Sequence, residues 1–244
     1  MSFSNISFIL HQPQLSENIG ACARALKNFN FDKLVLINPK PSFPNDKILA
    51  TSVGAKDIIK KSKVYQTLEP ALNKVDYLIA TTSRFRNKNI KHIQLNDLKK
   101  IDYTKKIAFL FGSEASGLTN NEISYSNCTM QIASNSNFKS LNLSHSVIIV
   151  AQIVFNLINL DLKNYSKSKK IGPATKKQIK SMLNLCIKNL EDRKFFKPKE
   201  KKPIMLENLR NIFYRMELSE KETRILSSVF ASLAKKKVDW QNNC

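Results

Sequence analysis

The sequence predicts an α/β protein: a parallel sheet with flanking helices, followed by a small helical C-terminal region. Two observations carry this prediction. Within residues 1–160, short apolar runs alternate with helical patterns, as they do in parallel sheets that are covered on both faces. After a polar segment rich in Lys and Ser, residues 176–244 keep only helical periodicity.

Short apolar runs that end at turn residues or polar loops are the expected strands. These runs are Ile6–Leu10, Leu34–Ile37, Tyr77–Thr81, Ile107–Phe111 and Met130–Ala133, and a further strand is allowed near Lys63–Tyr65. Ligands of parallel sheets bind beyond the carboxyl ends of the strands. We therefore expect the chemistry in three polar loops, Thr81–Ser83, Gly112–Leu118 and Asn135–Asn142.

Helical spacing of apolar residues predicts the other elements. In the first part of the chain it marks Ser16–Phe29, most of residues 40–75, a short turn at Thr119–Ser124 and a long helix at Leu141–Leu160. The apolar stretch of that long helix is interrupted by polar residues and is too short to span a bilayer, so we expect a buried helix and no membrane contact. In the last part, helices are expected at 175–192, 205–216 and 219–237.

Composition divides the chain into a domain of residues 1–160, a linker of residues 161–175 and a basic helical region of residues 176–244. Lys, Ser and Gly172-Pro173 mark the linker. The formal net charge is +21: residues 1–160 contribute +9 (19 basic, 10 acidic), and residues 161–244 contribute +12 (21 basic, 9 acidic). Such an excess of positive charge favours nucleic acid as the partner, ahead of a membrane surface. Asn, Ile and Ser are also abundant, so part of the lysine excess can reflect a genome-wide composition bias.

Cysteine and histidine are scarce and lack the spacing of metal ligands. The residues are Cys22, Cys128, Cys186, Cys244, His11, His92 and His145, without a C-x-x-C pair. We therefore expect neither a metal site nor disulfides, and a reducing cytoplasm fits this pattern. We also expect no signal peptide, because the N-terminus lacks a basic segment followed by a clean apolar one.

Gly112–Thr119 nearly matches a phosphate-binding loop. Leu118 occupies the position at which that loop needs lysine, and no G-x-G-x-x-G follows a strand. Nucleoside triphosphate hydrolysis and a standard dinucleotide fold are therefore disfavoured. Gly20, Gly112 and Gly117 are three of only five glycines. Each serves either a positive φ or the close approach of another group, or else plain turn geometry.

Three segments in register resemble the SpoU/TrmH group of the SPOUT RNA methyltransferases. Asn18–Ala25 is similar to the family's N-x-G-x-x-x-R-x motif, Leu110–Leu118 to its F-G-x-E-x-x-G-L motif, and Ser140–Ser144 to its S-L-N-x-S motif. The order and spacing of the segments also agree with the family. Each motif alone is weakly specific, whereas three in register are strongly specific.

The tail resembles the TrmJ subgroup of that family, through Leu209–Arg215 and the helix around Glu222–Leu226. That subgroup methylates the ribose at position 32 of the tRNA anticodon loop, on cytidine or uridine. The resemblance therefore implies a tRNA 2′-O-methyltransferase that uses S-adenosylmethionine (AdoMet). A ribosomal RNA target and a non-catalytic RNA-binding homologue are the alternatives. A DNA-binding protein is disfavoured, because no helix-turn-helix signature is present.

The family has an α/β fold with a C-terminal trefoil knot that holds AdoMet, and it works as a homodimer whose sites use both subunits. The resemblance implies the same here, with a methyl transfer that requires no metal. Carried over by motif, the cofactor-binding residues are Thr81, Thr82, Ser83, Gly112, Gly117, Ile132, Lys139, Ser140 and Leu141. Thr82, Ser83 and Lys139 depart from the commonest family residues, so their contacts are expected mainly from the backbone.

The expected catalytic residues are Arg24, Asn18, Glu114, Ser140 and Asn142. A ribose hydroxyl is a poor nucleophile, so the site must orient it and stabilise the developing alkoxide, for which the permanently charged Arg24 is the candidate; a surface salt bridge is the alternative. Asn18 either bonds substrate or caps its helix. Glu114 either orients Arg24 of the partner subunit or accepts backbone amides. Ser140 and Asn142 bind ligand, cap the long helix, or do both.

Other conspicuous side chains have structural interpretations. We expect His145 in the core or a dimer interface, and Cys22 and Cys128 in packing. Phe195-Phe196 and Trp240 either stack on RNA bases or, as we favour, anchor the tail. The lysine runs of the tail are expected to contact phosphates collectively.

Overall fold

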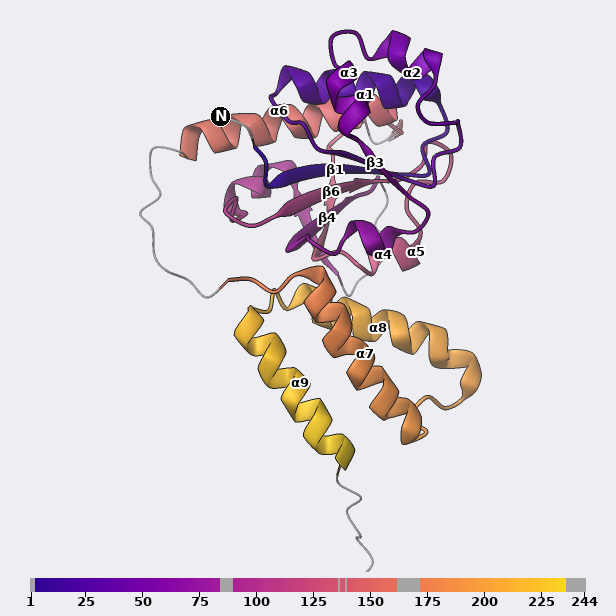
Figure 1. Ribbon diagram of the computed structural model, residues 1–244, viewed down its shortest axis with the longest axis vertical. Coiled ribbons are helices and arrows are strands. Elements are labelled where there is room, and N and C mark those ends of the chain that lie inside the picture. The colour runs from indigo at the N-terminus through magenta and orange to yellow at the C-terminus, as the bar shows by residue number, and fades with distance from the viewer. Residues whose placement is uncertain (1–2, 84–89, 136, 139, 162–171, 236–244) are drawn as a thin grey trace, which may run out of the picture.

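The structure, a computed structural model, describes residues 3–83, 90–135, 137–138, 140–161 and 172–235. The described residues form a seven-stranded sheet with helices on both faces, and three longer helices lie below it in Figure 1. Every pairing in the sheet is parallel, which confirms the predicted α/β class. Within the described residues, no helix combines the length and apolarity needed to cross a bilayer.

The strand order is β3-β2-β1-β6-β4-β7-β5. The strands are β1 Ile6–His11, β2 Leu34–Ile37, β3 Lys63–Tyr65, β4 Tyr77–Thr81, β5 Lys91–Gln94, β6 Ile107–Phe111 and β7 Cys128–Gln131. The central strands β1, β6 and β4 are apolar and almost wholly buried. Sequence patterning missed the edge strand β5, because Ile93 is its one buried position between polar neighbours.

One face of the sheet is covered by α1 (Ser16–Asn28), α2 (Asp46–Thr51), α3 (Lys56–Lys61) and α6 (Leu143–Asp161), with a 3₁₀ helix, η1 (Leu95–Lys100), beside α6. Side chains alternate along a strand, so Phe8 and Leu10 of β1 join this apolar cluster while Ile9 joins the cluster on the other face. The other face carries the short helices α4 (Leu68–Ala71) and α5 (Asn120–Ile123) (Figure 1).

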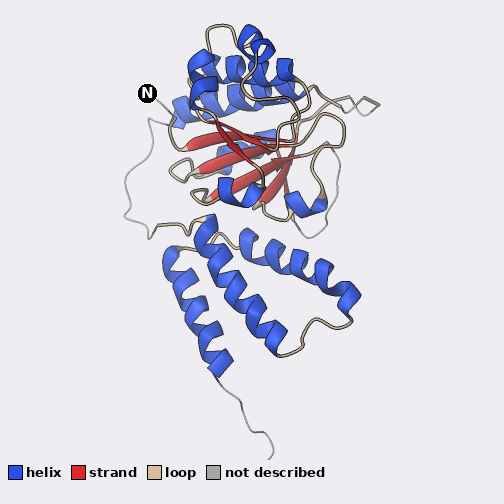
Figure 2. Cartoon of the chain, turned by 45° about the vertical axis from the view of Figure 1, so that its right-hand side comes forward, coloured by secondary structure: helices blue, strands red, loops and turns tan. Residues whose placement is uncertain are grey.

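The C-terminal unit consists of α7 (Lys176–Asp192), α8 (Lys202–Arg215, preceded by the 3₁₀ helix η2, Lys199–Lys201) and α9 (Glu220–Lys235), with α7 packed against both other helices (Figure 2). Its apolar side chains belong to the cluster on the second face of the sheet. Ile179, Met182 and Leu183 of α7 share this cluster with Leu72 and Val75. The unit is therefore docked on the sheet through a common core.

The predicted linker of residues 161–175 includes residues that pack into this unit. Ala174 is 1% exposed, and its N–H donates to the carbonyl of Leu218 at 2.8 Å. Pro173 pairs with Ser219 in an isolated β-bridge. The end of the predicted linker is thus structured, while residues 162–171 lie outside the described part of the chain.

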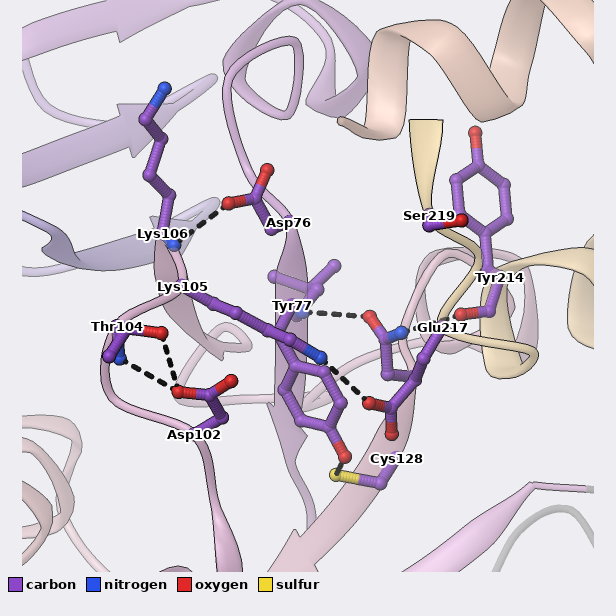
Figure 3. A network of polar contacts seen from close by, with 12 residues as sticks. Asp76, Tyr77, Asp102, Thr104, Lys105, Lys106, Cys128, Tyr214, Glu217 and Ser219 are labelled. Atoms are coloured by element: carbon purple, nitrogen blue, oxygen red, sulfur yellow. Dashed lines mark hydrogen bonds and ion pairs between the residues drawn. The ribbon is translucent and has the colours of Figure 1, made fainter. Parts of the chain in front are cut away.

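Polar contacts follow the seam between the sheet and the C-terminal unit (Figure 3). The Nζ of Lys105 lies 3.0 Å from Glu217 Oε2, which joins the segment before β6 to the segment after α8. Asn127 Nδ2 donates to the carbonyl of Tyr214 at 2.6 Å, and Lys176 Nζ donates to Asn127 Oδ1. These contacts, of which the two made by Asn127 are buried, join the C-terminal unit to the sheet.

The predicted elements agree with the structure to within a few residues. The strand expected at Met130–Ala133 is β7, which starts two residues earlier because Cys128 already pairs with both β4 and β5. The helix expected at 205–216 is α8, which starts earlier, at Lys202. Pro203 fits in its first turn, because proline lacks an N–H and first-turn N–H groups have no partner within the helix.

Candidate functional site

A pocket of about 290 Å³ lies where β4, β6 and β7 end, at the carboxyl edge of the sheet. Its walls are the loop after β4, the loop after β6, and the segment between β7 and α6. The lining residues are Thr81, Thr82, Ser83, Phe111, Gly112, Ser113, Glu114, Ala115, Ser116, Gly117, Leu118, Ile132, Ser140, Leu141, Leu143 and Ser146. The three loops expected to carry the chemistry therefore do meet in space.

Eight of the nine predicted cofactor-binding residues line this pocket. They are Thr81, Thr82, Ser83, Gly112, Gly117, Ile132, Ser140 and Leu141. The ninth, Lys139, lies outside the described residues. Sequence reasoning missed the contributions of Leu143 and Ser146, which follow directly from the helical turn that α6 adds to the wall.

Two glycines shape the loop after β6. A Cβ at Gly112 would overlap the backbone of Gly117, so the loop folds back onto the strand end only because position 112 has no side chain. Gly117 has φ +67°, a conformation that side-chain-bearing residues avoid, and its N–H donates to the carbonyl of Ser113 at 2.9 Å. The loop is a tight turn whose shape is fixed before any ligand binds.

Glu114 extends from this loop to the start of α1. Its Oε2 accepts the N–H of Gln14 at 2.9 Å, and its Oε1 accepts the N–H of Leu15 at 3.4 Å and the Nδ2 of Asn18 at 2.8 Å. A helix N-terminus presents unpaired N–H groups with partial positive charge, which favours a carboxylate there. Glu114 therefore accepts backbone amides, one of its two expected roles, and they belong to the β1–α1 connection.

Asn18 connects the first motif to the third. Its Nδ2 donates to Glu114, and its Oδ1 accepts from Asn142 Nδ2 at 3.0 Å. The capping interpretation of Asn18 was wrong: α1 begins after Leu15, without a side-chain cap. Asn142 does cap its helix, because its Oδ1 accepts the N–H of Ser144 at 2.8 Å. One continuous chain of hydrogen bonds thus joins all three motifs.

Arg24 lies further along α1 and is exposed. It does not line the pocket, and no hydrogen bond or ion pair joins it to another described residue. The salt bridge that was its alternative interpretation is therefore absent from the described part of the chain. Within one subunit, the structure gathers Asn18, Glu114, Ser140 and Asn142 at the pocket and leaves Arg24 outside it.

Gly20 serves close approach, one of the roles expected for it, and the approaching group is a neighbouring helix. It lies inside α1, and a Cβ there would overlap Thr51 Oγ1 and lie 2.5 Å from the carbonyl oxygen of Ile48. The missing side chain allows α2 to pack directly against α1. Sequence reasoning could not see this, because the partner helix lies in the ambiguous segment 40–75.

The other cysteine, histidine and aromatic residues considered in the sequence differ in how deeply they are buried. Cys22 and Cys128 are fully buried, as expected, and burial raises the pKa of the Cys128 thiol to about 11. His145 is exposed, so the core interpretation was wrong. Phe196 is buried and Phe195 is 52% exposed; Trp240 lies outside the described residues. Among the described residues, no three His, Cys, Asp or Glu side chains gather as metal ligands would.

His11 is a residue near the site that sequence reasoning passed over. It ends β1 at 8% exposure, and its Nδ1 lies 3.5 Å from Glu122 Oε1. Burial lowers the pKa of His11 below its ordinary value of 6.5, and the nearby Glu122 carboxylate acts in the opposite sense. In the sequence, the feature that could have indicated His11 as a site residue is its position at the end of an otherwise apolar strand.

Fold and pocket together define an α/β protein with its ligand site at the carboxyl edge of a parallel sheet. The sequence model of the SpoU rRNA methylase family matches residues 5–152, which include all three motif segments. The chain therefore belongs to the SpoU methylase family.

Relatives and solved structures extend the similarity to the C-terminal unit. The tRNA (cytidine-2′-O-)-methyltransferase TrmJ of Sulfolobus acidocaldarius is 31% identical, over 89% of this chain and 97% of its own. The tRNA (cytidine/uridine/adenosine-2′-O-)-methyltransferase TrmJ of Pseudomonas aeruginosa is 29% identical, over 89% of each chain. The crystal structure of TrmJ from Z. mobilis ZM4 superposes with a TM-score of 0.84 at 26% identity, covering 94% of this chain and 99% of that one.

Proposed function

We propose that this protein transfers a methyl group from AdoMet to a ribose 2′-hydroxyl of tRNA. The convergence of the three motifs carries the proposal: Asn18, Glu114 and Asn142, up to 124 positions apart in sequence, are hydrogen-bonded into one chain beside the pocket. Membership of the SpoU methylase family and the names of the TrmJ relatives support the reaction type.

The residues of the pocket fit AdoMet in kind. The volume of about 290 Å³ is at the lower end of small-molecule pockets, about 300–1,000 Å³. Hydroxyl groups and the backbone of a glycine-containing turn suit the polar ends of the cofactor, and Ile132, Leu118 and Leu141 suit its adenine ring. When bound, AdoMet supplies a methyl group that its sulfonium already activates for transfer, so we assign no metal.

The chain's own residues then have to orient the ribose and stabilise negative charge on its oxygen. Arg24 is the candidate for the second task, because its guanidinium stays protonated and a preorganised cation at a developing alkoxide lowers the barrier. Glu114, Asn18 and Asn142 hold the start of α1 against the pocket loops, which positions the reacting groups. We assign the acceptance of the ribose proton to water or to a phosphate of the substrate.

We propose a homodimer, and the position of Arg24 supports it. Arg24 is exposed and outside the pocket of its own subunit, so a second subunit has to complete the site if Arg24 contacts the ribose. Exposed apolar side chains are available for such an interface near the pocket: Leu15 is 52% exposed, and Leu141 and Ile148 are each 37% exposed. A two-fold dimer that covers them would build two equivalent composite sites.

The substrate is tRNA, and within it we favour the ribose at position 32 of the anticodon loop, on cytidine or uridine. The similarity to TrmJ proteins covers the C-terminal unit as well as the catalytic domain. We assign residues 1–160 to the methyltransferase domain, 161–175 to the connection, and 176–244 to tRNA binding. Residues 161–244 together carry +12 in about half the length over which residues 1–160 carry +9. The SPOUT resemblance adds a trefoil knot behind the pocket and a cytoplasmic location.

One assay separates this proposal from its rivals. The protein is incubated with labelled AdoMet and either bulk tRNA or ribosomal RNA, and products are mapped by nuclease digestion and mass spectrometry. A 2′-O-methylated nucleotide 32 in tRNA supports reaction, substrate and position together. Label in ribosomal RNA alone, the target in the family's description, overturns the substrate. A folded protein that binds no AdoMet is the non-catalytic homologue.

A further inference from the structure

The wall of the pocket formed by the loop after β6 is held at its start and middle by contacts already described. Gly112 continues β6, and Glu114 binds the backbone N–H groups of Gln14 and Leu15. The end of the loop, where Gly117 and Leu118 line the pocket, leads into α5 at Thr119. What fixes this end therefore decides the shape of one pocket wall.

The start of α5 is a reciprocal cap in which one carboxylate oxygen is left over. The Oγ1 of Thr119 accepts the N–H of Glu122 at 3.3 Å, and Glu122 Oε2 accepts the N–H of Thr119 at 2.7 Å. The other oxygen, Oε1, faces His11 Nδ1 at 3.5 Å. The exposed fractions of these two side chains are 10% for His11 and 16% for Glu122, so the contact is largely shielded from water.

The place of His11 in the sheet brings it to both ends of the loop. Leu10 pairs with Phe111 in the parallel register of β1 and β6, so the next position sets His11 beside Gly112, where the loop begins. Side chains alternate along β1, so His11 shares the face of Ile9, the face on which Leu118 and Ile123 pack. From there it reaches Glu122, just beyond the end of the loop.

We infer that His11 is a positioning residue for the cofactor pocket: through Glu122 it holds the exit of the Gly112–Leu118 loop against the end of β1. This inference rests on the proposed function, because it takes the pocket to be the AdoMet site. Burial lowers the pKa of the His11 ring and so favours its neutral form. In the Nδ1–H tautomer, that form would direct its proton toward Glu122 Oε1, 3.5 Å away. His11 acts through the loop, without touching the ligand itself.

The test is the dissociation constant of AdoMet, measured by calorimetry on the full chain, with thermal unfolding recorded for each variant. His11→Leu keeps the side-chain bulk and removes the donor, so we expect AdoMet to bind about fivefold more weakly, the size of one lost polar contact. His11→Asn places an amide nitrogen where Nδ1 lies and should bind within about twofold of wild type. His11→Gln places its amide at the position of Nε2 and should resemble His11→Leu.

A matched control and a double mutant separate this role from a general structural one. His92 is a half-buried histidine on the edge strand β5, where its Nδ1 lies 3.1 Å from Thr129 Oγ1. His92→Leu should leave AdoMet affinity unchanged. Glu122→Gln keeps a capping acceptor, and its effect on affinity should be smaller in the His11→Leu background than alone. This coupling also serves as the test if one single variant is too unstable to compare.

Three results would overturn the inference. The first is that His11→Leu binds AdoMet as tightly as wild type. The second is that the effects of His11→Leu and Glu122→Gln on affinity simply add, and the third is that His92→Leu loses as much affinity as His11→Leu. Each would exclude a specific role for His11. Wild-type protein that is folded and binds no AdoMet would remove the proposed function and this inference together. Wild-type binding with an unaffected His11→Leu variant removes the inference alone.

Discussion

Lys176 Nζ donates a hydrogen bond to Asn127 Oδ1 and lies 4.7 Å from the centroid of the Tyr214 ring, with Lys176 only 1% exposed. The same Asn127 oxygen accepts the N–H of Leu78 in β4 at 2.9 Å. One amide therefore joins the sheet to the first residue of α7. No carboxylate of the described residues lies within ion-pair distance of Lys176, and Glu217 and Asp76 act on its charge only from further away.

Replacing this lysine should make stability less dependent on pH. Burial lowers the pKa of Lys176 from 10.5 to about 7, whereas the unfolded chain keeps it protonated up to about 10.5. The unfolded state thus binds more protons above pH 7, and this lysine's contribution to stability rises there by about 1.4 kcal/mol per pH unit. Lys176→Met should be more stable than wild type at pH 7, by a margin that narrows as pH rises.

Urea unfolding of both proteins between pH 7 and 9 measures this margin. The window stops at pH 9 because tyrosine in the unfolded chain ionises at about pH 10. Cysteine ionises at about pH 8.5, but its contribution is common to both proteins and cancels from the margin. Lys177→Met is the matched control, since its neighbour Lys177 is exposed, and it should leave the free energy of unfolding unchanged at every pH. A margin that stays constant with pH would mean that folded Lys176 keeps its proton throughout this window, and would contradict the lowered pKa.

Glu114→Gln should weaken both folding and AdoMet binding. An amide keeps one acceptor oxygen and loses the second, so Gln14, Leu15 and Asn18 can no longer all be satisfied. We expect the free energy of unfolding to fall by about 1–3 kcal/mol, as for a lost bond to a charged group. Glu17→Gln, on the helix α1 whose start Glu114 contacts and paired with Lys47 at the surface, should cost less than about 0.5 kcal/mol. Equal effects of the two variants would contradict a special role for Glu114.

The strands and helices that have a clear local sequence pattern could be predicted, and so could the loops of the pocket. Strands such as Ile107–Phe111 are apolar along their length, and parallel sheets place their carboxyl ends together, so the three pocket loops followed from the order of elements. The bond between Asn18 and Asn142 was not predictable in this way. It depends on the approach of α1 to α6, which only packing decides.

Lys176 and Lys177 show where sequence reasoning ends. They are adjacent and identical in chemistry, yet Lys176 is buried against Tyr214 and Lys177 is exposed. The Thr175 cap fixes where α7 starts and hence which of the two faces the sheet. The sequence predicted a helix from about residue 175, but no local pattern reports the docking surface that α7 meets.

Arg24→Ala should abolish methyl transfer while AdoMet affinity stays within a few fold, because Arg24 lies outside the pocket of its own subunit. If both subunits build each site, a second variant should complement it. Gly112→Ala closes the pocket loop of one subunit and leaves its Arg24 intact. Co-expressed in equal amounts, the two inactive chains should recover about a quarter of wild-type activity, since half of the dimers contain one intact site.

Lys27→Ala is the control for this experiment, since Lys27 lies on the same helix and pairs with Asp57 at the surface. It should retain wild-type turnover. Loss of AdoMet binding in Arg24→Ala would contradict the role in charge stabilisation. Mixed chains with no recovered activity, although heterodimers are detected, would show that each subunit carries a complete site.

The tail's proposed contact with tRNA is best tested by removing charge. A cut near Lys169 would be expected to weaken RNA binding more than cofactor binding, but it would also strip α7 from the apolar cluster that includes Leu72 and Val75. Exposed lysines on α7 avoid this complication. They are Lys177, Lys180 and Lys188, and replacing all three by Gln leaves Ile179 and Met182 in place.

We expect this triple variant to bind tRNA more weakly by tenfold or more in low salt, because fewer counterions are released when fewer phosphates are contacted. The slope of log affinity against log salt should also become shallower, by about 0.7–0.9 for each contact removed. The matched control replaces three exposed lysines of α3 by Gln, namely Lys56, Lys60 and Lys61, with the same change in net charge. If both triple variants lose affinity equally, the tail contributes only to the overall field of the protein. If only the α7 variant loses affinity, and its AdoMet dissociation constant is unchanged, the C-terminal unit holds the tRNA backbone directly.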